Sequence, residues 1–139
     1  MNEIERWLPH RDPFLFVDDV HIEDGIIRAS RKFREDEFFF RGHFPDYPVV
    51  PGVLLIETLA QAGGVGVKMM GVTPNGLFVL VKVRDASFRR QVRPGETLDI
   101  EIHNIKAGPA LVHQKGVGKV NGERTVEAEW VCMATGVPE

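Results

Sequence analysis

Apolar and polar positions alternate along most of the chain, on both sides of one continuous apolar segment. Before that segment, residues 14–23 and 26–33 flank Asp24-Gly25, a strong signal for a two-residue β-hairpin. Residues 34–40, REDEFFF, are expected to extend a strand or form a bulged edge. After the segment, alternation recurs between glycine- and proline-containing turn signals in residues 77–92, 96–107, 110–120 and 123–134. The pattern predicts a hairpin followed by three or four antiparallel strands.

The apolar segment, residues 52–70, is the only long helix candidate. A short amphipathic helix is also expected at residues 2–8. Its apolar side chains fall on two helical stripes, which is typical of a buried helix. Three glycines at positions 63, 64 and 66 weaken the helix by up to about 1 kcal/mol each, and we expect them to permit close approach of a neighbouring backbone. A curled antiparallel sheet wrapped around one central helix satisfies this order, so we expect a single α+β domain spanning residues 1–139.

Composition narrows the classes of protein. A net charge of −3 gives no general attraction to nucleic acid or to anionic membranes. A single cysteine, Cys132, excludes an internal disulfide and suits a reducing cytoplasm. No signal peptide is visible, and Pro51, Glu57 and Gln61 interrupt the apolar segment, so it does not read as a membrane span. We therefore expect a cytoplasmic protein with neither nucleic acid nor membrane as a partner.

Glu57 is the one carboxylate inside the predicted buried helix. An isolated ionised carboxylate is too costly to bury, so Glu57 must find a partner or stay protonated, which makes it a candidate general acid. Gln61 lies four residues later on the same helical face, where it can orient the carboxyl group. The alternative, equally weighted on chemistry alone, is that Glu57 faces an unseen crevice or a subunit partner.

His43 lies on the loop that leads into this helix, where Pro45, Pro48 and Pro51 restrict the backbone. An imidazole held in this way is a candidate general base. Gly52 stands at the expected helix start, where an unpaired N–H could bind a carbonyl oxygen. Taken singly, a loop histidine and a glycine at a helix start are more often structural. The 14-residue separation of His43 and Glu57 does not show that they meet, either within a chain or across a dimer.

Other motifs are weaker. The remaining histidines lack metal-ligand spacing, and neither a P-loop nor a dinucleotide glycine fingerprint is present, so no metal site is predicted. Cys132 alternates inward with Trp130 and reads as core rather than as a nucleophile. Five basic residues lie close together in the sequence: Lys82, Arg84, Arg89, Arg90 and Arg93. They form either a solvated strand face or a patch that binds an acidic protein.

Three blocks together resemble the bacterial (3R)-hydroxyacyl-acyl-carrier-protein dehydratases of the FabZ type: LPHRDPFLFVDDV (8–20), GHFPDYPVVPGVLLIETLAQAGG (42–64) and FRRQVRPGETL (88–98). The resemblance implies a hotdog fold and a dimer, often a trimer of dimers, with active sites at the subunit interface. It implies that His43 and Glu57 are catalytic, with Glu57 supplied by the partner subunit, and that the Gly52 amide polarises the thioester. Supporting positions are Gln61, Phe44 and Pro51.

The implied reaction is reversible dehydration of (3R)-3-hydroxyacyl thioesters to trans-2-enoyl thioesters, in fatty-acid biosynthesis or a related acyl-chain pathway. It requires no metal or redox cofactor, because the substrate arrives on the phosphopantetheine of acyl carrier protein, for which Arg89, Arg90 and Arg93 are a candidate dock. Asp12 and Asp46-Tyr47 depart from the family pattern and bear on substrate preference and loop gating. A hotdog thioesterase, or a non-catalytic acyl-binding or assembly subunit, remains the alternative.

Overall fold

A computed structural model describes residues 2–139. One six-stranded antiparallel sheet has the strand order β1-β2-β4-β5-β6-β3, and one long helix, α2, lies against it. The elements in chain order are α1 (Glu3–Trp7), β1 (Asp19–Glu23), β2 (Ile26–Lys32), the 3₁₀ helix η1 (Phe38–Arg41), α2 (Gly52–Met69), β3 (Phe78–Phe88), β4 (Thr97–Ala107), β5 (Leu111–Val120) and β6 (Glu123–Ala134).

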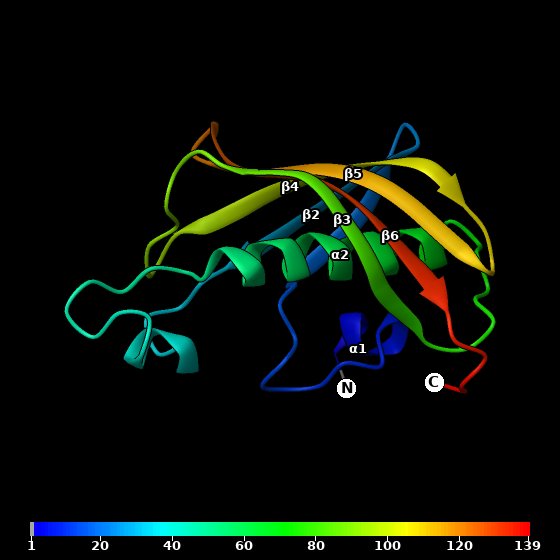
Figure 1. Ribbon diagram of the computed structural model, residues 1–139, viewed down its shortest axis with the longest axis horizontal. Helices are drawn as coiled ribbons and strands as arrows, with labels where there is room; N and C mark the ends of the chain where they lie inside the picture. The colour runs from blue at the N-terminus through cyan, green and yellow to red at the C-terminus, as the bar shows by residue number, and fades with distance from the viewer. Residues whose placement is uncertain (1) are drawn as a thin grey trace.

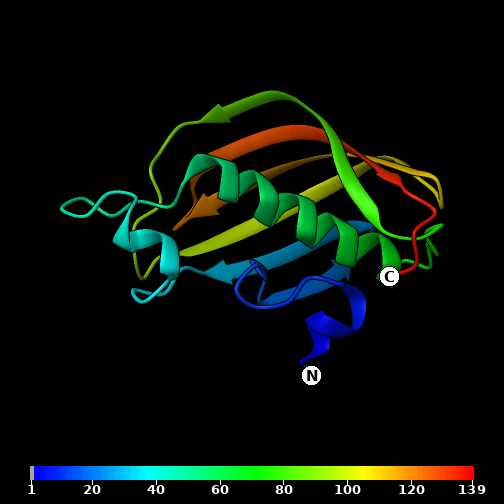
Figure 2. The ribbon, with the colours of Figure 1, turned by 60° about the horizontal axis from the view of Figure 1, so that its bottom comes forward.

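The sheet curls around α2, so the helix lies in the concave face with strands arching over it (Figures 1 and 2). Apolar side chains from α2 and from the inner face of the strands form one continuous core, which includes fully buried Leu59, Val65 and Trp130. This is the hotdog arrangement, and the α+β prediction is confirmed. In residues 2–139, no helix is both long enough and apolar enough to cross a membrane.

Both predicted hairpin turns are confirmed. Asp24 and Gly25 have φ values of 52° and 77°, and Asn121 and Gly122 have φ values of 50° and 80°. Two consecutive residues in this left-handed region are what a two-residue hairpin needs, and Asn-Gly and Asp-Gly adopt it at little cost. The register follows, with Glu23 paired to Ile26 across the first turn.

The first predicted strand is too long at its start. Residues 14–18 are not part of β1, which begins at Asp19. They form an irregular segment beside α2, where Phe16 and Val17 are both almost fully buried and the N–H of Phe16 donates to the Oε1 of Gln61 at 2.8 Å. The sequence did not reveal this difference, because a short run of four apolar residues is compatible with either a strand or a loop that packs on a helix. The last part of the predicted strand 77–92 is also outside the sheet, since β3 ends at Phe88.

The prediction that REDEFFF continues a strand is wrong. The segment instead turns into η1, which buries two consecutive aromatic rings, those of Phe39 and Phe40. A strand would point successive side chains to opposite faces, whereas a tight helical turn lets neighbouring rings reach the same core. The two rings contact each other edge to face, with centroids 4.7 Å apart.

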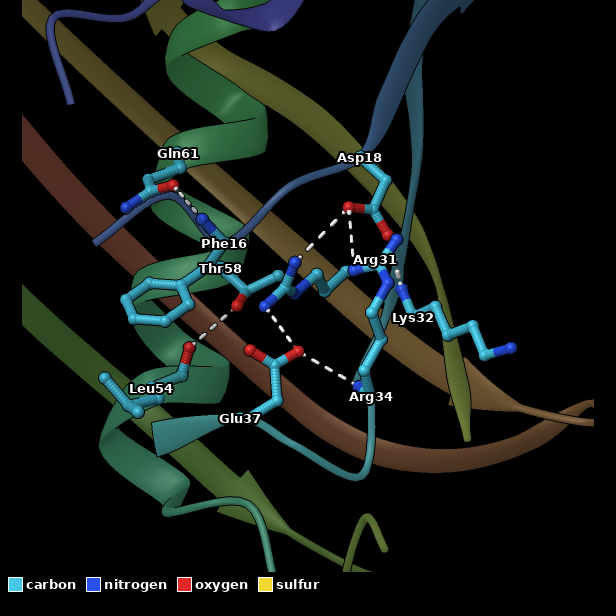
Figure 3. Close-up of polar contacts among 9 residues, drawn as sticks. All are labelled: Phe16, Asp18, Arg31, Lys32, Arg34, Glu37, Leu54, Thr58 and Gln61. Carbon is cyan, nitrogen blue, oxygen red and sulfur yellow. Dashed lines mark hydrogen bonds and ion pairs between the residues drawn. The ribbon is translucent and has the colours of Figure 1, made fainter. Parts of the chain in front are cut away.

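A buried ion cluster fixes the chain between β2 and η1 (Figure 3). The guanidinium of Arg31, whose side chain is 7% exposed, lies 2.8 Å from Oε2 of Glu37 and 3.3 Å from Oδ1 of Asp18. The same Glu37 oxygen accepts the N–H of Arg34 at 3.0 Å, and Asp18 accepts the N–H of Lys32 at 2.7 Å. These contacts hold the segment that leads through η1 to the His43 loop.

The helix glycines permit close approach of side chains, not of backbone as the sequence suggested. A Cβ on Gly66 would lie 2.5 Å from Cδ1 and Cγ1 of Ile27, and one on Gly63 would lie 2.2 Å from Oε1 of Gln114. Gly64 differs, because its nearest contact would be Cδ2 of Leu8 at 3.7 Å. Two of the three glycines are therefore required by packing, whereas a methyl group at the third would make only ordinary van der Waals contact.

Gln114, on β5 and almost fully buried, links α2 to the sheet. Its Nε2 donates to the carbonyl oxygen of Gly63 at 3.2 Å and to Oδ1 of Asn104 on β4 at 2.8 Å. Its Oε1 accepts the indole N–H of Trp130 on β6 at 3.2 Å. One amide thus satisfies polar groups from three other elements in the core, where leaving them unpaired would be costly.

The glycines give a matched stability test. Gly66→Ala is expected to lower the free energy of unfolding, because overpacking against Ile27 costs about 1–3 kcal/mol and exceeds the gain in helix propensity. Gly64→Ala is expected to raise it by up to about 1 kcal/mol, since the added methyl group meets only ordinary contact. Urea unfolding of both variants at one protein concentration checks this. Equal changes of the same sign would contradict the assignment.

Candidate active site

Glu57 opens into a cavity of about 300 Å³, here called the Glu57 cavity, between α2, the segment 8–14 and the sheet. Its α2 wall is a single helical stripe formed by Glu57, Ala60, Gln61, Gly64 and Lys68. The opposite wall is mostly apolar and comes from the start of β3, from β5 and from β6. Glu57 is half-buried, with 21% of its side chain exposed, so the predicted buried carboxylate faces a cavity instead of the core.

Gln61 orients the Glu57 carboxyl group, as its spacing predicted. Its Nε2 donates to Oε2 of Glu57 at 2.9 Å and to the carbonyl oxygen of Phe14 at 3.1 Å. Its Oε1 accepts the N–H of Phe16 (Figure 3). Because the backbone N–H can only donate, the amide orientation is determined, and the nitrogen must face Glu57.

His10 also lies at Glu57, and sequence reasoning missed it. Its Nε2 is 3.6 Å from Oε2 of Glu57, and its Nδ1 is buried with no hydrogen-bond partner in residues 2–139. Burial lowers the pKa of His10, an effect that the Glu57 carboxylate partly opposes. The imidazole is therefore neutral near pH 7. The histidines outside the His43 loop were searched only for metal-ligand spacing, which could not reveal His10 as a neighbour of Glu57. The position of His10 in the LPHRDPF block was the sequence feature that indicated a place in the site.

His43 is held by its own loop in one tautomer. Its Nδ1 lies 3.1 Å from the carbonyl oxygen of Val49, which can only accept, so Nδ1 carries the proton in the neutral ring. The remaining nitrogen, Nε2, then has a free lone pair. The backbone closes around the ring, because His43 N–H donates to Phe39 and Val49 N–H donates to the His43 carbonyl. Phe44 stacks on the imidazole with ring centroids 4.3 Å apart.

His43 and Gly52 line one cavity of about 420 Å³, here called the His43 cavity, together with Phe88 and the start of the 89–93 segment. Gly52 is the first residue of α2, with Pro51 at the N-cap, and its N–H has no acceptor within residues 2–139. A Cβ at Gly52 would lie 3.0 Å from the Phe88 ring, so a side chain would crowd this wall. The base and the backbone donor predicted from sequence are brought together.

Glu57 does not join them in the same chain. Gly52 and Glu57 are five positions apart on α2, which separates their directions around the helix axis by about 140°. The two cavities also meet opposite ends of β3: Phe78, Val79 and Leu80 line the Glu57 cavity, and Phe88 lines the His43 cavity. Within one chain, the candidate acid and the candidate base thus serve different cavities.

The three candidate docking arginines lie beside the His43 cavity but differ in whether a carboxylate neutralises their charge. Arg89 pairs with Glu127, and Arg90 pairs with Glu96 at 2.6 Å. The hydrogen bonds from Arg90 hold the pKa of the Glu96 carboxyl below its ordinary value. Arg93 instead lies over the Tyr47 ring, 3.9 Å from its centroid, and has no carboxylate partner in residues 2–139.

Tyr47, one of the departures from the family pattern, connects the His43 loop to this basic segment. Its hydroxyl donates to Oε1 of Gln91 at 2.8 Å, while its ring receives the Arg93 guanidinium. A cation over an aromatic face contributes about 0.5–1 kcal/mol at an exposed site. The departure at position 47 therefore supplies two contacts that hold the loop in place.

Cys132 lies half-buried on the wall of the Glu57 cavity, not deep in the core. Burial raises the pKa of its thiol to about 11, and the nearby Glu57 carboxylate adds to this shift. The thiolate is the reactive form, so the raised pKa makes Cys132 a poor nucleophile. This agrees with the interpretation from sequence that it is not a nucleophile.

Alkylation should therefore be slow. At pH 8 the thiolate fraction of Cys132 is expected to be on the order of a hundredfold below that of a free thiol with an ordinary pKa of about 8.5. Its rate with iodoacetamide should continue to rise between pH 9 and about 11, if the protein stays folded. Mass spectrometry against a cysteine peptide measures both rates, and a peptide-like rate at pH 8 would contradict the assignment.

The comparisons with known proteins bear on this site as a whole. A family model described as a FabA-like domain matches residues 8–129. The 3-hydroxyacyl-[acyl-carrier-protein] dehydratase FabZ of Bacillus velezensis is 40% identical over 129 residues, covering 91% of this chain and 92% of that protein. FabZ of Pectobacterium atrosepticum is 42% identical over 136 residues, covering 95% and 90%.

Solved structures share the fold at low identity. The dehydratase heterocomplex ApeI:P from Xenorhabdus doucetiae superposes with a TM-score of 0.79 at 21% identity, covering 95% of this chain and 90% of that one. The smu.793 protein of Streptococcus mutans, bound to acetyl CoA, superposes with a TM-score of 0.66 at 15% identity, covering 95% and 98%. The family match, which includes His10, His43, Gly52 and Glu57, and the curated relatives together carry the classification. The chain belongs to the FabA-like family and, within it, to the FabZ-type 3-hydroxyacyl-[acyl-carrier-protein] dehydratases.

Proposed function

We propose that this protein is a 3-hydroxyacyl-[acyl-carrier-protein] dehydratase, a lyase that interconverts (3R)-3-hydroxyacyl and trans-2-enoyl thioesters in fatty-acid biosynthesis. Relatives at 40–42% identity over nearly the whole chain carry this name. The observation that carries the chemistry is the His43 tautomer: with its proton on Nδ1 toward Val49, the ring presents an unprotonated Nε2 to the cavity shared with Gly52. We assign no step to a metal or redox cofactor.

In the proposed first step, Nε2 of His43 removes the proton from the α-carbon of the thioester. The negative charge that develops on the thioester oxygen is bound by the Gly52 N–H, at the positive end of the α2 dipole. A preorganised donor of this kind typically contributes about 3–4 kcal/mol to the transition state. The absence of a side chain at Gly52 keeps this donor accessible, which supports its role.

Glu57 then completes elimination. In its protonated form it donates a proton to the departing hydroxyl group, directly or through a water that it orients, and water leaves as the double bond forms. Gln61 supports this role because its Nε2 donates to one carboxyl oxygen, Oε2, while Oε1 has no hydrogen-bond partner among residues 2–139. In the reverse direction the same carboxylate activates water for addition.

The complete site is assembled, in this proposal, from two subunits. β3 is an edge strand, eleven residues long, with an exposed apolar surface that includes Val79, Val81 and Val83. A long apolar edge strand is a template for pairing with another chain. If β3 pairs antiparallel with its copy about a two-fold axis, its first residues lie opposite the partner's last ones. The Glu57 cavity of one subunit then adjoins the His43 cavity of the other.

The phosphopantetheine arm enters, we propose, past the 89–93 segment. Acyl carrier protein is acidic, and Arg93 is the arginine of this segment that lies free of a carboxylate partner in the described chain. Arg89 and Arg90 contribute less net charge because Glu127, Glu96 and Glu123 neutralise them. We propose that the reaction takes place in the cytoplasm and that three dimers form the larger assembly.

To test this proposal, the purified protein is incubated with crotonyl thioesters of carrier protein and of coenzyme A, and the absorbance of the conjugated enoyl thioester is recorded over time. Loss of the conjugated signal without release of free thiol is the expected result, faster on the carrier protein. Thiol release would identify a thioesterase instead. Binding without any turnover on either handle would identify a non-catalytic acyl-binding subunit.

A further inference from the structure

The Glu57 cavity continues well past the carboxyl group. Its α2 stripe runs from Glu57 through Ala60 and Gly64 to Lys68, eleven residues further on, which is roughly 16 Å along the helix axis. The facing wall is mostly apolar and includes Phe78 and Leu80 from β3. A chain attached to a reacting group at Glu57 therefore has a lined path along the helix toward its C-terminal end.

Two charged side chains, those of Lys68 and Glu139, lie at the far end of this path. The Lys68 ammonium lies 2.6 Å from Oε1 of Glu139 and donates to the carbonyl oxygen of Trp7 at 2.7 Å. Only 13% of the Lys68 side chain is exposed, compared with 32% for Glu139. Both residues line the cavity, and Figure 2 shows the C-terminus beside the end of α2. An apolar trough thus terminates at an anchored ion pair drawn from two segments 71 residues apart.

Building on the proposed function, we propose that the Lys68–Glu139 pair is the end wall of the acyl site and selects short and medium acyl thioesters. Each methylene placed against the apolar walls is expected to raise kcat/KM about fourfold. A methylene that reaches the pair gains nothing, because it must either desolvate the two charges or displace Glu139. The value of kcat/KM should therefore rise with chain length until the chain reaches the pair and fall for longer chains. The chain length at which the rise stops is called the break.

Gly64 is not the limiting constriction. It lies between Glu57 and Lys68 on the same stripe, and a Cβ there would come no closer than 3.7 Å to Cδ2 of Leu8. The missing side chain leaves room for an acyl chain to pass over this turn of α2. The limit therefore lies further along, at Lys68, and a larger side chain at position 64 would move it back toward Glu57.

The experiment measures kcat/KM for a series of trans-2-enoyl thioesters of increasing chain length on one handle, for wild type and for Lys68→Met/Glu139→Gln. The double variant replaces the pair with uncharged side chains of similar length. The chain length at which kcat/KM stops rising should become longer, and the first substrates beyond the wild-type limit should gain tenfold or more relative to crotonyl thioester measured with the same variant. Glu139→Gln alone, which keeps the Lys68 anchor to Trp7, should move the break in the same direction.

Two further variants test whether the effect is specific to this end of the cavity. Gly64→Leu should move the break to shorter chains. Arg28→Met/Glu101→Gln removes a 2.7 Å ion pair on the outer face of the sheet and should leave the profile unchanged. Ratios between chain lengths within one variant cancel any effect on the acid–base step, since Lys68 and Glu139 both influence the pKa of His10.

The outcomes separate the two proposals. A wild-type profile that keeps rising through the longest chains, or a break that the double variant leaves in place, overturns the end wall while leaving the dehydratase intact. Absence of turnover for every chain length in wild type overturns the proposed function itself. If Lys68→Met/Glu139→Gln does not fold, Glu139→Gln decides between these results.

Discussion

Glu57→Gln is expected to lower kcat for dehydration by about 10²–10⁴-fold, because an amide cannot deliver the proton that the departing hydroxyl needs. The substitution is nearly isosteric, and the oxygen of the introduced amide can still accept from Nε2 of Gln61, so stability should hardly change. His43→Ala should cause a loss of similar size by removing the base. Stopped-flow measurement of single turnovers on crotonyl thioester quantifies both losses.

The control is Glu101→Gln. Glu101 also lies beside a histidine, with its Oε2 2.9 Å from Nε2 of His103, but on β4 and away from both cavities. It should retain full turnover. Normal turnover by a folded Glu57→Gln or His43→Ala protein with its oligomeric state unchanged would make these residues structural.

Mixing the two inactive proteins is expected to restore activity. If each site takes His43 from one subunit and Glu57 from the other, a His43→Ala/Glu57→Gln heterodimer keeps one intact site of its two. Random exchange makes half of the dimers heterodimers, so activity should recover to about one quarter of the wild-type value. The recovery should follow the rate of subunit exchange, measured by native mass spectrometry.

The matching control mixes the double variant His43→Ala plus Glu57→Gln with each single variant. No dimer in either mixture contains an intact site, so both should stay inactive. Failure of the two single variants to complement after proven exchange would mean that each site is built within one chain, and the proposed pairing through β3 would be wrong.

Local patterns predicted the sheet well where one residue type carries the geometry. Asp24-Gly25 and Asn121-Gly122 determine their turns because the backbone there needs positive φ. The same kind of reasoning failed for residues 34–40, where three successive phenylalanines allow either a strand or a helical turn. The choice depends on which core the rings reach, and that core is formed by residues distant in sequence.

For the site, the helix contacts were predictable and the long-range ones were not. Gln61 follows Glu57 by one turn of a helix, so their contact was evident from spacing. His10 is 47 residues before Glu57, and nothing local links the two. The contact of Glu139 with Lys68 depends on the path of the whole chain after β6, which no pattern in either segment encodes.

The Gln114 amide has a consequence for how the molecule opens. Because this side chain donates to the backbone of α2 at Gly63, the helix cannot separate from the sheet without breaking that bond and leaving a buried carbonyl oxygen unpaired, while the same amide ties β5 to β4 and β6. The amide protons of the middle of α2 and of β5 should then exchange with deuterium together, through one cooperative opening close to global unfolding. The η1 segment and the His43 loop lie outside this unit, so their amide protons are expected to exchange through separate local openings.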